Sequence, residues 1–182
     1  MNQAQAPEVW MRGPVAGYAA ELQPVVHALL QVRDEVEQHA ASLTTEQLWA
    51  RPAETASIGF HLRHLAGSLD RLLTYARGEP LTADQFETLR TEADPGMPAA
   101  SPASVLSLSL AGIDRALDQL RATDASTLPQ ARLVGRARYP TTVLGLLFHA
   151  AEHASRHAGQ IATTRKVVSP GRTPEAAFPS PM

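Results

Sequence analysis

Five of the 7 histidines in this chain fall into two short clusters, and imidazole is a preferred ligand of transition-metal ions. The first cluster holds His61 and His64. The second holds His149, His153 and His157, in the segment FHAAEHASRHAGQI. Residues four apart in a helix lie on one face, one turn above the other, so their imidazoles can converge on a single ion. The two clusters together predict a divalent metal site.

The helical wheel of the second cluster separates its three histidines. Its buried face is predicted from small and apolar residues at helical spacing: Val143, Leu147, Ala150, Ala154, Ala158 and Ile161. His157 then lies about 40° from the centre of that face, His153 about 80° and His149 about 120°. The inward pair is therefore His153 and His157.

A third ligand must come from another helix, because one helix cannot surround an ion. His61 and His64 are the candidates. By angle, His61 lies nearer the leucine stripe of its own helix and His64 lies on the flank of that stripe. A bundle helix contacts two neighbours, so its buried arc is wide enough for either residue, and the wheel leaves the choice open.

Other catalytic chemistry has little support in the sequence. The chain contains no cysteine, which excludes a thiolate nucleophile, a disulfide and a zinc–thiolate site. Glu152 is adjacent to a predicted ligand but points elsewhere on the wheel. We identify no catalytic acid or base beyond the histidines, so the catalytic residues stay unknown.

Composition excludes several classes of partner. Hydrophobic residues make up 44% of the 182 residues, enough for a full core. The net charge is -2, the Lys and Arg residues do not cluster, and only 5% of residues are aromatic, so we expect no nucleic-acid partner. No apolar run approaches the roughly 20 residues of a membrane span. The N-terminal residues lack the pattern of a signal peptide, and we expect a cytoplasmic protein.

Four amphipathic segments predict an all-α, antiparallel four-helix bundle. Helical periodicity predicts the first at about 17–41 and the second at about 57–77. Ser101-Pro102 opens the third, whose apolar stripe continues to Leu120. The fourth begins at Pro140 with Thr141 and Thr142 and continues to about Val168. Residues 1–169 are predicted to form one domain, and 170–182, rich in Pro, Gly and Ser, a disordered tail.

The connections are long enough for a crossover between helices. Thr44 and Gln47 predict a short capped turn after the first helix. Residues 81–100 are predicted to form a polar connection with one helical turn near Phe86. Residues 132–139 are predicted to be extended.

With these residues in place, the chain resembles the DinB-like superfamily over nearly the whole domain, from about Val15 to Val168. The segments that carry the resemblance are SIGFHLRHLAGSLDRLL and HAAEHASRHAGQI. The resemblance implies a four-helix bundle with a crossover and a single metal ion, often zinc or nickel, with one ligand from the second helix and two from the fourth. By motif these are His64, which precedes Leu-Ala, and the pair His153 and His157, which closes on Gly-Gln.

The periodicity agrees with the motif about the pair, and on the second helix we follow the motif. His61 stays an alternative ligand. His61 and His149 are extra histidines that either orient a ligand, carry a proton or form a polar wall of the pocket.

The resemblance also implies the function. Some members are thiol-dependent transferases or isomerases that use mycothiol, bacillithiol or glutathione, and we take this S-transferase or isomerase type as the leading hypothesis. A metal-dependent hydrolase using a metal-bound hydroxide is the first alternative. A non-catalytic metal-binding bundle in stress response or sensing is the second. The substrate is expected to be a small molecule, and look-alikes suggest a homodimer.

Overall fold

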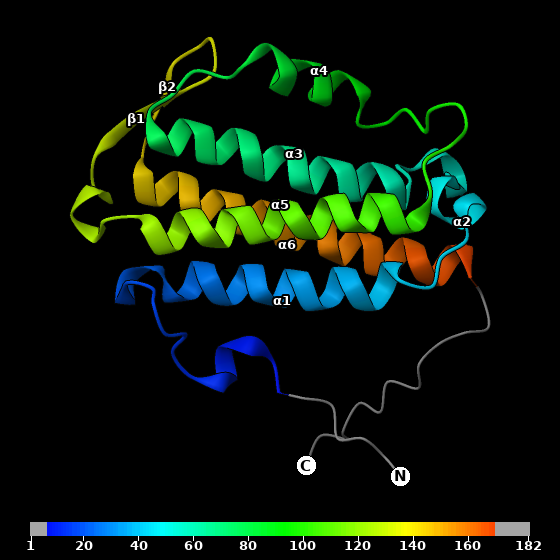
Figure 1. The fold of residues 1–182 in the computed structure, drawn as a ribbon, viewed down its shortest axis with the longest axis horizontal. Helices are drawn as coiled ribbons and strands as arrows, with labels where there is room; N and C mark the ends of the chain where they lie inside the picture. Colours follow the sequence, from blue (N-terminus) through cyan, green and yellow to red (C-terminus); the bar gives the residue numbers. More distant parts are fainter. Residues whose placement is uncertain (1–6, 170–182) are drawn as a thin grey trace.

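The computed structural model describes residues 7–169, and four long helices dominate it (Figure 1). They are α1 (Gln23–Ala40), α3 (Ile58–Arg77), α5 (Pro102–Ala122) and α6 (Val143–Val168). The last three begin at side-chain caps, in which Ser57, Ser101 and Thr142 accept hydrogen bonds from backbone N–H groups of the first turn. The four-helix bundle predicted from the apolar stripes is therefore confirmed.

The first helix begins later than its periodicity predicted. A 3₁₀ turn, η2 (Ala20–Leu22), precedes α1, and a further 3₁₀ turn, η1 (Val9–Arg12), lies nearer the N-terminus. Pro24 lies in the first turn of α1, where its missing N–H removes no helical hydrogen bond. Leu22, although it lies in η2, is fully buried and continues the apolar stripe toward the N-terminus.

The order of the helices around the bundle reveals the crossover. α3 packs between α5 and α6, and α1 packs between the same two helices on the other side. Following the chain in Figure 1, α1 and α6 run in one direction, while α3 and α5 run in the other. Neighbours α3 and α6 are thus antiparallel, whereas α3 and α5 are parallel. A parallel pair needs a connection that returns along its whole length, and residues 78–101 provide it.

The core lies between these four helices. Leu29, Leu62, Ile113 and Leu147, one from each long helix, are fully buried. α3 and α5 approach closely, since a Cβ on Gly112 would lie 2.9 Å from the Cβ of Ala66.

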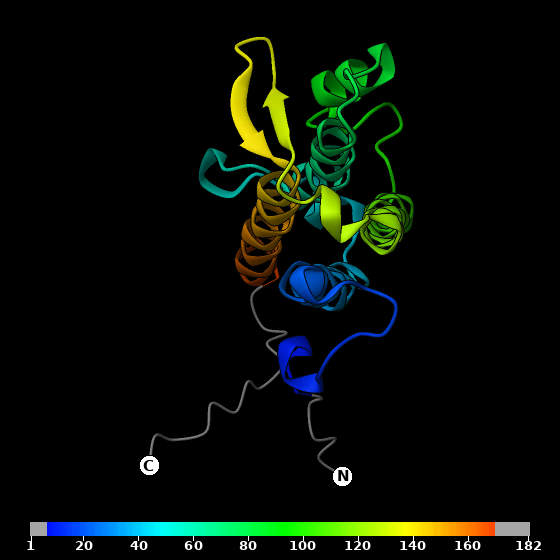
Figure 2. The same cartoon turned by 90° about the vertical axis from the view of Figure 1, so that its left-hand side faces the viewer.

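The connection from α3 to α5 contains more helix than the sequence analysis predicted. Instead of one turn near Phe86, α4 spans Ala83–Thr91, with a capping box between Thr82 and Gln85. None of the residues of α4 is buried, so it lacks the apolar stripe on which the prediction depended. Figure 2 shows α4 on the outside of the bundle, on the side away from α1.

Two further connections follow the predictions more closely. α2 (Thr45–Trp49) has the predicted capping box between Thr44 and Gln47, and η3 (Pro52–Glu54) follows it. After α5 and the 3₁₀ turn η4 (Ala125–Thr127), the segment predicted to be extended forms an antiparallel hairpin of β1 (Ala131–Val134) and β2 (Tyr139–Thr142). The hairpin leads directly into α6.

The length and hydropathy of the described helices can be compared with those of a membrane span. None of those within 7–169 combines the length and hydropathy that crossing a bilayer would require. The tail predicted at 170–182 lies outside the described residues.

Candidate metal centre

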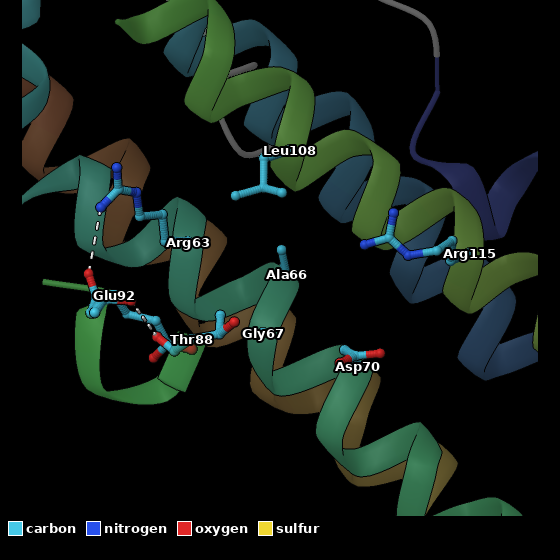
Figure 3. Close-up of a pocket in the computed structure, with 9 residues that line it drawn as sticks. Arg63, Ala66, Gly67, Asp70, Thr88, Glu92, Leu108 and Arg115 are labelled. Atoms are coloured by element: carbon cyan, nitrogen blue, oxygen red, sulfur yellow. Dashed lines mark hydrogen bonds between the residues drawn. The ribbon is translucent and has the colours of Figure 1, made fainter. Parts of the chain in front are cut away.

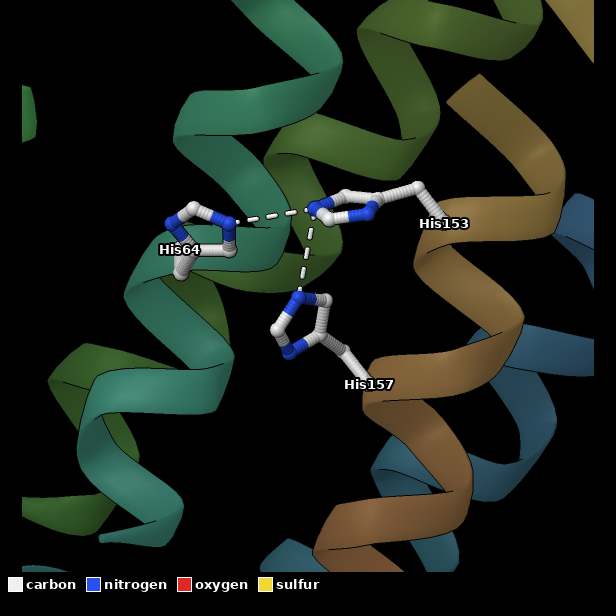
Figure 4. A group of neighbouring side chains, drawn as sticks. All are labelled: His64, His153 and His157. Carbon is white, nitrogen blue, oxygen red and sulfur yellow. Dashed lines mark hydrogen bonds between the residues drawn. The ribbon is translucent and has the colours of Figure 1, made fainter. Parts of the chain in front are cut away.

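Three histidines from two helices converge between those helices (Figure 4). The Nε2 atom of His153 lies 3.1 Å from Nε2 of His64 and 3.2 Å from Nε2 of His157. One nitrogen from each ring can be chosen so that all three lie within 4.8 Å of one another. Nitrogens bound to a tetrahedral zinc ion at about 2.0–2.1 Å would be roughly 3.3 Å apart. The donor set and its spacing therefore fit a metal ion held by three imidazoles.

The bundle topology brings these residues together. His64 lies in α3, His153 and His157 lie in α6, and these two helices are packed neighbours. On α6, Ala150, Ala154 and Ala158 are buried as the wheel predicted.

His61, the other candidate on α3, is brought to a different position. Its side chain is buried, with 6% exposure, as its place near the leucine stripe suggested. Its Nδ1 atom lies 2.9 Å from Nδ1 of His157, the nitrogen opposite the one that faces His153. His61 therefore contacts His157 on the side of the ring away from His153. Its imidazole is placed to hold the orientation of the His157 ring.

His149 is not brought into the group. Its side chain is 51% exposed, and its Nδ1 lies 3.3 Å from Oε2 of Glu152. Glu152 also pairs with Arg156 on the surface of α6, which agrees with its outward direction on the wheel. Neither residue is positioned as a ligand in this arrangement.

Burial keeps several of these imidazoles neutral near pH 7. Removal from water, followed by the charge of His64, lowers the pKa of His61 from 6.5 to about 4. Removal from water and the charges of His64, His153, His61 and Arg156 lower the pKa of His157 to about 3. The pKa of His153 is lowered mainly by burial as well. A neutral imidazole has the free lone pair that metal binding requires.

A buried acidic residue that sequence reasoning missed contacts His64. Oε2 of Glu92 lies 2.7 Å from Nδ1 of His64, and Oε1 of Glu92 accepts a hydrogen bond of 2.7 Å from Arg71. Glu92 follows α4 directly, and its side chain is only 2% exposed. The Thr82–Gln85 capping pattern could have predicted α4, but no sequence pattern marks Glu92 as buried, because that depends on how α4 folds back onto α3.

A cavity of about 400 Å³ lies beside His61, outside the three-histidine group. His61 lines it together with residues of α6 that include Arg156, Gly159 and Thr163. A Cβ placed on Gly159 would meet nothing within 4 Å, so this side of α6 is open. The cavity has the size of a small-molecule pocket.

Comparisons with known proteins agree with this architecture. The model of the DinB superfamily matches residues 28–161. YfiT from Bacillus subtilis, described as a probable metal-dependent hydrolase with an unusual four-helix bundle topology, superposes with a TM-score of 0.61 at 17% identity, over 85% of this chain and 92% of YfiT. A conserved protein from Enterococcus faecalis gives a TM-score of 0.57 at 22% identity, over 81% and 96% of the two chains. At these identities the two likenesses establish the fold alone. A search of curated proteins gives no match.

Proposed function

We propose that this chain, which belongs to the DinB superfamily, is a metal-dependent enzyme that binds one divalent ion through His64, His153 and His157. The observation that carries the proposal is the convergence of their three ring nitrogens within 4.8 Å. All three donors are imidazoles, which suit zinc and nickel better than magnesium or calcium. Held by three protein ligands, such an ion would supply Lewis acidity at an open coordination position.

Thiol-dependent transfer is the reaction that we place first. The acidic groups that contact the histidine clusters are already paired, Glu92 with Arg71 and Glu152 with Arg156. No cysteine is present to act as a nucleophile. A low-molecular-weight thiol would bring its own nucleophile, and its pKa near 8.5 in solution lies well below the value of about 15.7 for bulk water, before a metal ion lowers either value. Such a cosubstrate therefore makes the smallest demand on a protein base.

Metal-dependent hydrolysis is the second candidate. It is favoured by the likeness to YfiT, a protein described as a probable metal-dependent hydrolase. In this chain His61 lines a cavity and is not among the three proposed ligands. Under either reaction, a small-molecule substrate would have to reach the open position of the ion, whereas the cavity of about 400 Å³ is lined by His61 and by none of the three proposed ligands.

The first experiment is the metal content of tag-free protein, measured by elemental analysis after incubation with zinc or nickel and desalting. We expect about one ion per chain, lost in His64→Ala, His153→Ala and His157→Ala. His149→Ala is the matched control, because His149 is exposed and lies outside the convergent group, and it should keep the ion. A chain that binds neither metal would overturn the proposal.

The same experiment decides between the two histidines of α3. His61→Ala should keep the ion with reduced affinity, because His61 contacts His157 but does not join the convergent nitrogens. Metal retained in His64→Ala and lost in His61→Ala would instead make His61 the ligand.

Metal-loaded protein would then be screened with two sets of substrates. The first set combines a thiol such as glutathione, mycothiol or bacillithiol with an electrophile, and the second contains activated esters and amides. Turnover should require the metal and disappear in His153→Ala. Bound metal without turnover in either screen would favour the non-catalytic alternative.

The homodimer and the cytoplasmic location stay predictions, and sedimentation equilibrium would test the homodimer.

A further inference from the structure

The carboxylate of Glu92 packs against α3 at a position where the helix has a glycine and no side chain. Glu92 lines a cavity of about 420 Å³ between α3, α4 and α5, together with Gly67 of α3 (Figure 3). A Cβ on Gly67 would overlap Oε1 of Glu92 and would lie 2.8 Å from Nη1 of Arg71. Gly67 is three residues after His64, so the same face of α3 carries the histidine and the gap that admits the carboxylate.

Arg71 forms an ion pair with Glu92 and so influences how the carboxylate can hydrogen-bond to His64. The Arg71–Glu92 pair is almost fully buried, and the guanidinium lies 2.7 Å from Oε1. A guanidinium has only donors, so Glu92 meets Arg71 as an acceptor, and the carboxylate of this ion pair has acceptor oxygens and no hydrogen to donate. Because Oε2 lies 2.7 Å from Nδ1 of His64, the hydrogen of this contact must be on the imidazole.

That assignment places the lone pair of His64. A neutral imidazole has one N–H group, so with hydrogen on Nδ1 the Nε2 atom is free. Nε2 is the atom that lies 3.1 Å from Nε2 of His153, in the middle of the convergent group. We propose that Glu92 is a positioning residue of the metal centre, which accepts the Nδ1–H of His64 and thereby directs its Nε2 lone pair toward the ion.

The proposal gives the connection between α3 and α5 a role in the metal site. Residues 78–101 include α4, which lies outside the bundle along α3. Glu92 follows α4 directly, and it is the buried residue through which this connection contacts His64. The inference rests on the proposed ligand role of His64, so its test needs a measurement that does not depend on bound metal.

Glu92→Gln provides a sharp test, because it keeps the size of the side chain and changes its hydrogen bonding. Arg71 has only donors and would retain the amide oxygen, so the amide NH₂ would face Nδ1 of His64. His64 should then carry its hydrogen on Nε2, the nitrogen that has to bind the ion. We expect ¹⁵N NMR of metal-free protein above pH 8 to show His64 as the Nδ1–H tautomer in the native chain and as Nε2–H in Glu92→Gln. Zinc affinity, measured by competition with a chelator, should fall by about 10–100-fold.

Glu87→Gln is the matched control, since Glu87 lies in α4, five residues before Glu92, and forms an exposed pair with Arg90. It should change neither the tautomer nor the affinity. The double variant Glu92→Gln with Arg71→Met allows the amide to turn its oxygen toward His64 and also removes the buried, unpaired guanidinium. It should restore the Nδ1–H tautomer and part of the zinc affinity, which a merely structural role of Glu92 would not produce.

The outcomes separate this inference from the proposed function. A His64 tautomer and a zinc affinity that are unchanged in folded Glu92→Gln would overturn the role of Glu92 while leaving the metal site intact. A native Nδ1–H tautomer that switches in Glu92→Gln, in a chain that binds no metal, would establish the contact and refute the metal centre. An Nε2–H tautomer in the native chain would overturn the inference directly.

Discussion

Gly67 faces the buried carboxylate of Glu92 with no side chain of its own, and its replacement would fill that space. In Gly67→Ala the new methyl group must displace both Glu92 and Arg71, which are buried and paired. Overpacking costs about 1–3 kcal/mol, against a gain of about 0.5–1 kcal/mol from replacing glycine in a helix. We expect a net loss in the free energy of unfolding, measured with urea, together with weaker zinc binding.

Gly159→Ala is the control for this substitution. Gly159 is also helical, but a Cβ there meets nothing within 4 Å, so only the favourable helix term applies. It should raise the free energy of unfolding by about 0.5–1 kcal/mol. Equal effects of the two alanines would show that Gly67 is not constrained by Glu92.

The lowered pKa values of His61 and His157 predict how the stability of the metal-free protein depends on pH. In the unfolded chain both imidazoles take up a proton near pH 6.5, whereas in the folded chain they do so only at about 4 and about 3. Below pH 6.5 the unfolded state therefore binds more protons, and the stability of the fold should decrease as the pH falls toward 3.

Urea unfolding in the presence of a chelator, between pH 7.5 and 5, would measure this decrease. The double variant His61→Gln with His157→Gln should show a flatter profile in this range, because it lacks the two imidazoles whose pKa values are lowered to about 4 and about 3 in the folded state. A profile as steep as that of the native chain would assign the dependence to other residues.

At the level of elements, α4 is held by its cap and by hydrogen bonds from Gln85 to α3 rather than by a buried apolar face. The hydroxyl of Thr82 accepts a hydrogen bond from the backbone N–H of Gln85, and α4 buries none of its residues. Thr82→Ala should cost about 0.5–2 kcal/mol of local helix stability. Amide hydrogen exchange should accelerate across 83–92, while the core of α3 and α6 stays protected, because local opening does not require global unfolding.

Thr44→Ala is the matched control, since Thr44 forms the same kind of capping box at the start of α2. It should accelerate exchange in α2 and leave 83–92 unchanged. If Thr82→Ala also weakens zinc binding, the order of α4 is coupled to the metal centre through Glu92. Faster exchange throughout the bundle after Thr82→Ala would mean that α4 is part of the cooperative core.

For the whole molecule, the proposed ion would connect α3 to α6 and stabilise the folded state. A ligand present at 100 times its Kd stabilises the state that binds it by about 2.7 kcal/mol. Thermal unfolding with zinc at this excess should therefore occur at a higher temperature than with a chelator. The difference should vanish in His64→Ala and persist in His149→Ala, because only the former removes a convergent nitrogen. An unfolding temperature that zinc does not change in the native chain would contradict the prediction.

The sequence determined the parts of this protein that depend on local periodicity. The stripes of α3 and α6 predicted both helices, because burial of one face repeats every 3.6 residues. The same rule selected His153 and His157 as the inward pair on α6, and the structure brings their nitrogens within 3.2 Å. The motif around His64 indicated the third member of the group.

Only the tertiary structure decided which histidine of α3 meets the pair on α6, and which buried residue contacts that histidine. The wheel could not choose between His61 and His64, because α3 has two neighbours and both residues face the interior. The parallel arrangement of α3 and α5 requires the long connection that returns Glu92 to His64. Glu92 is polar, belongs to no stripe and lies 28 positions from His64, so its burial results from the path of the chain in space. Contacts between distant segments carry no local pattern, and for this reason the convergent histidines could be predicted while the carboxylate that contacts them could not.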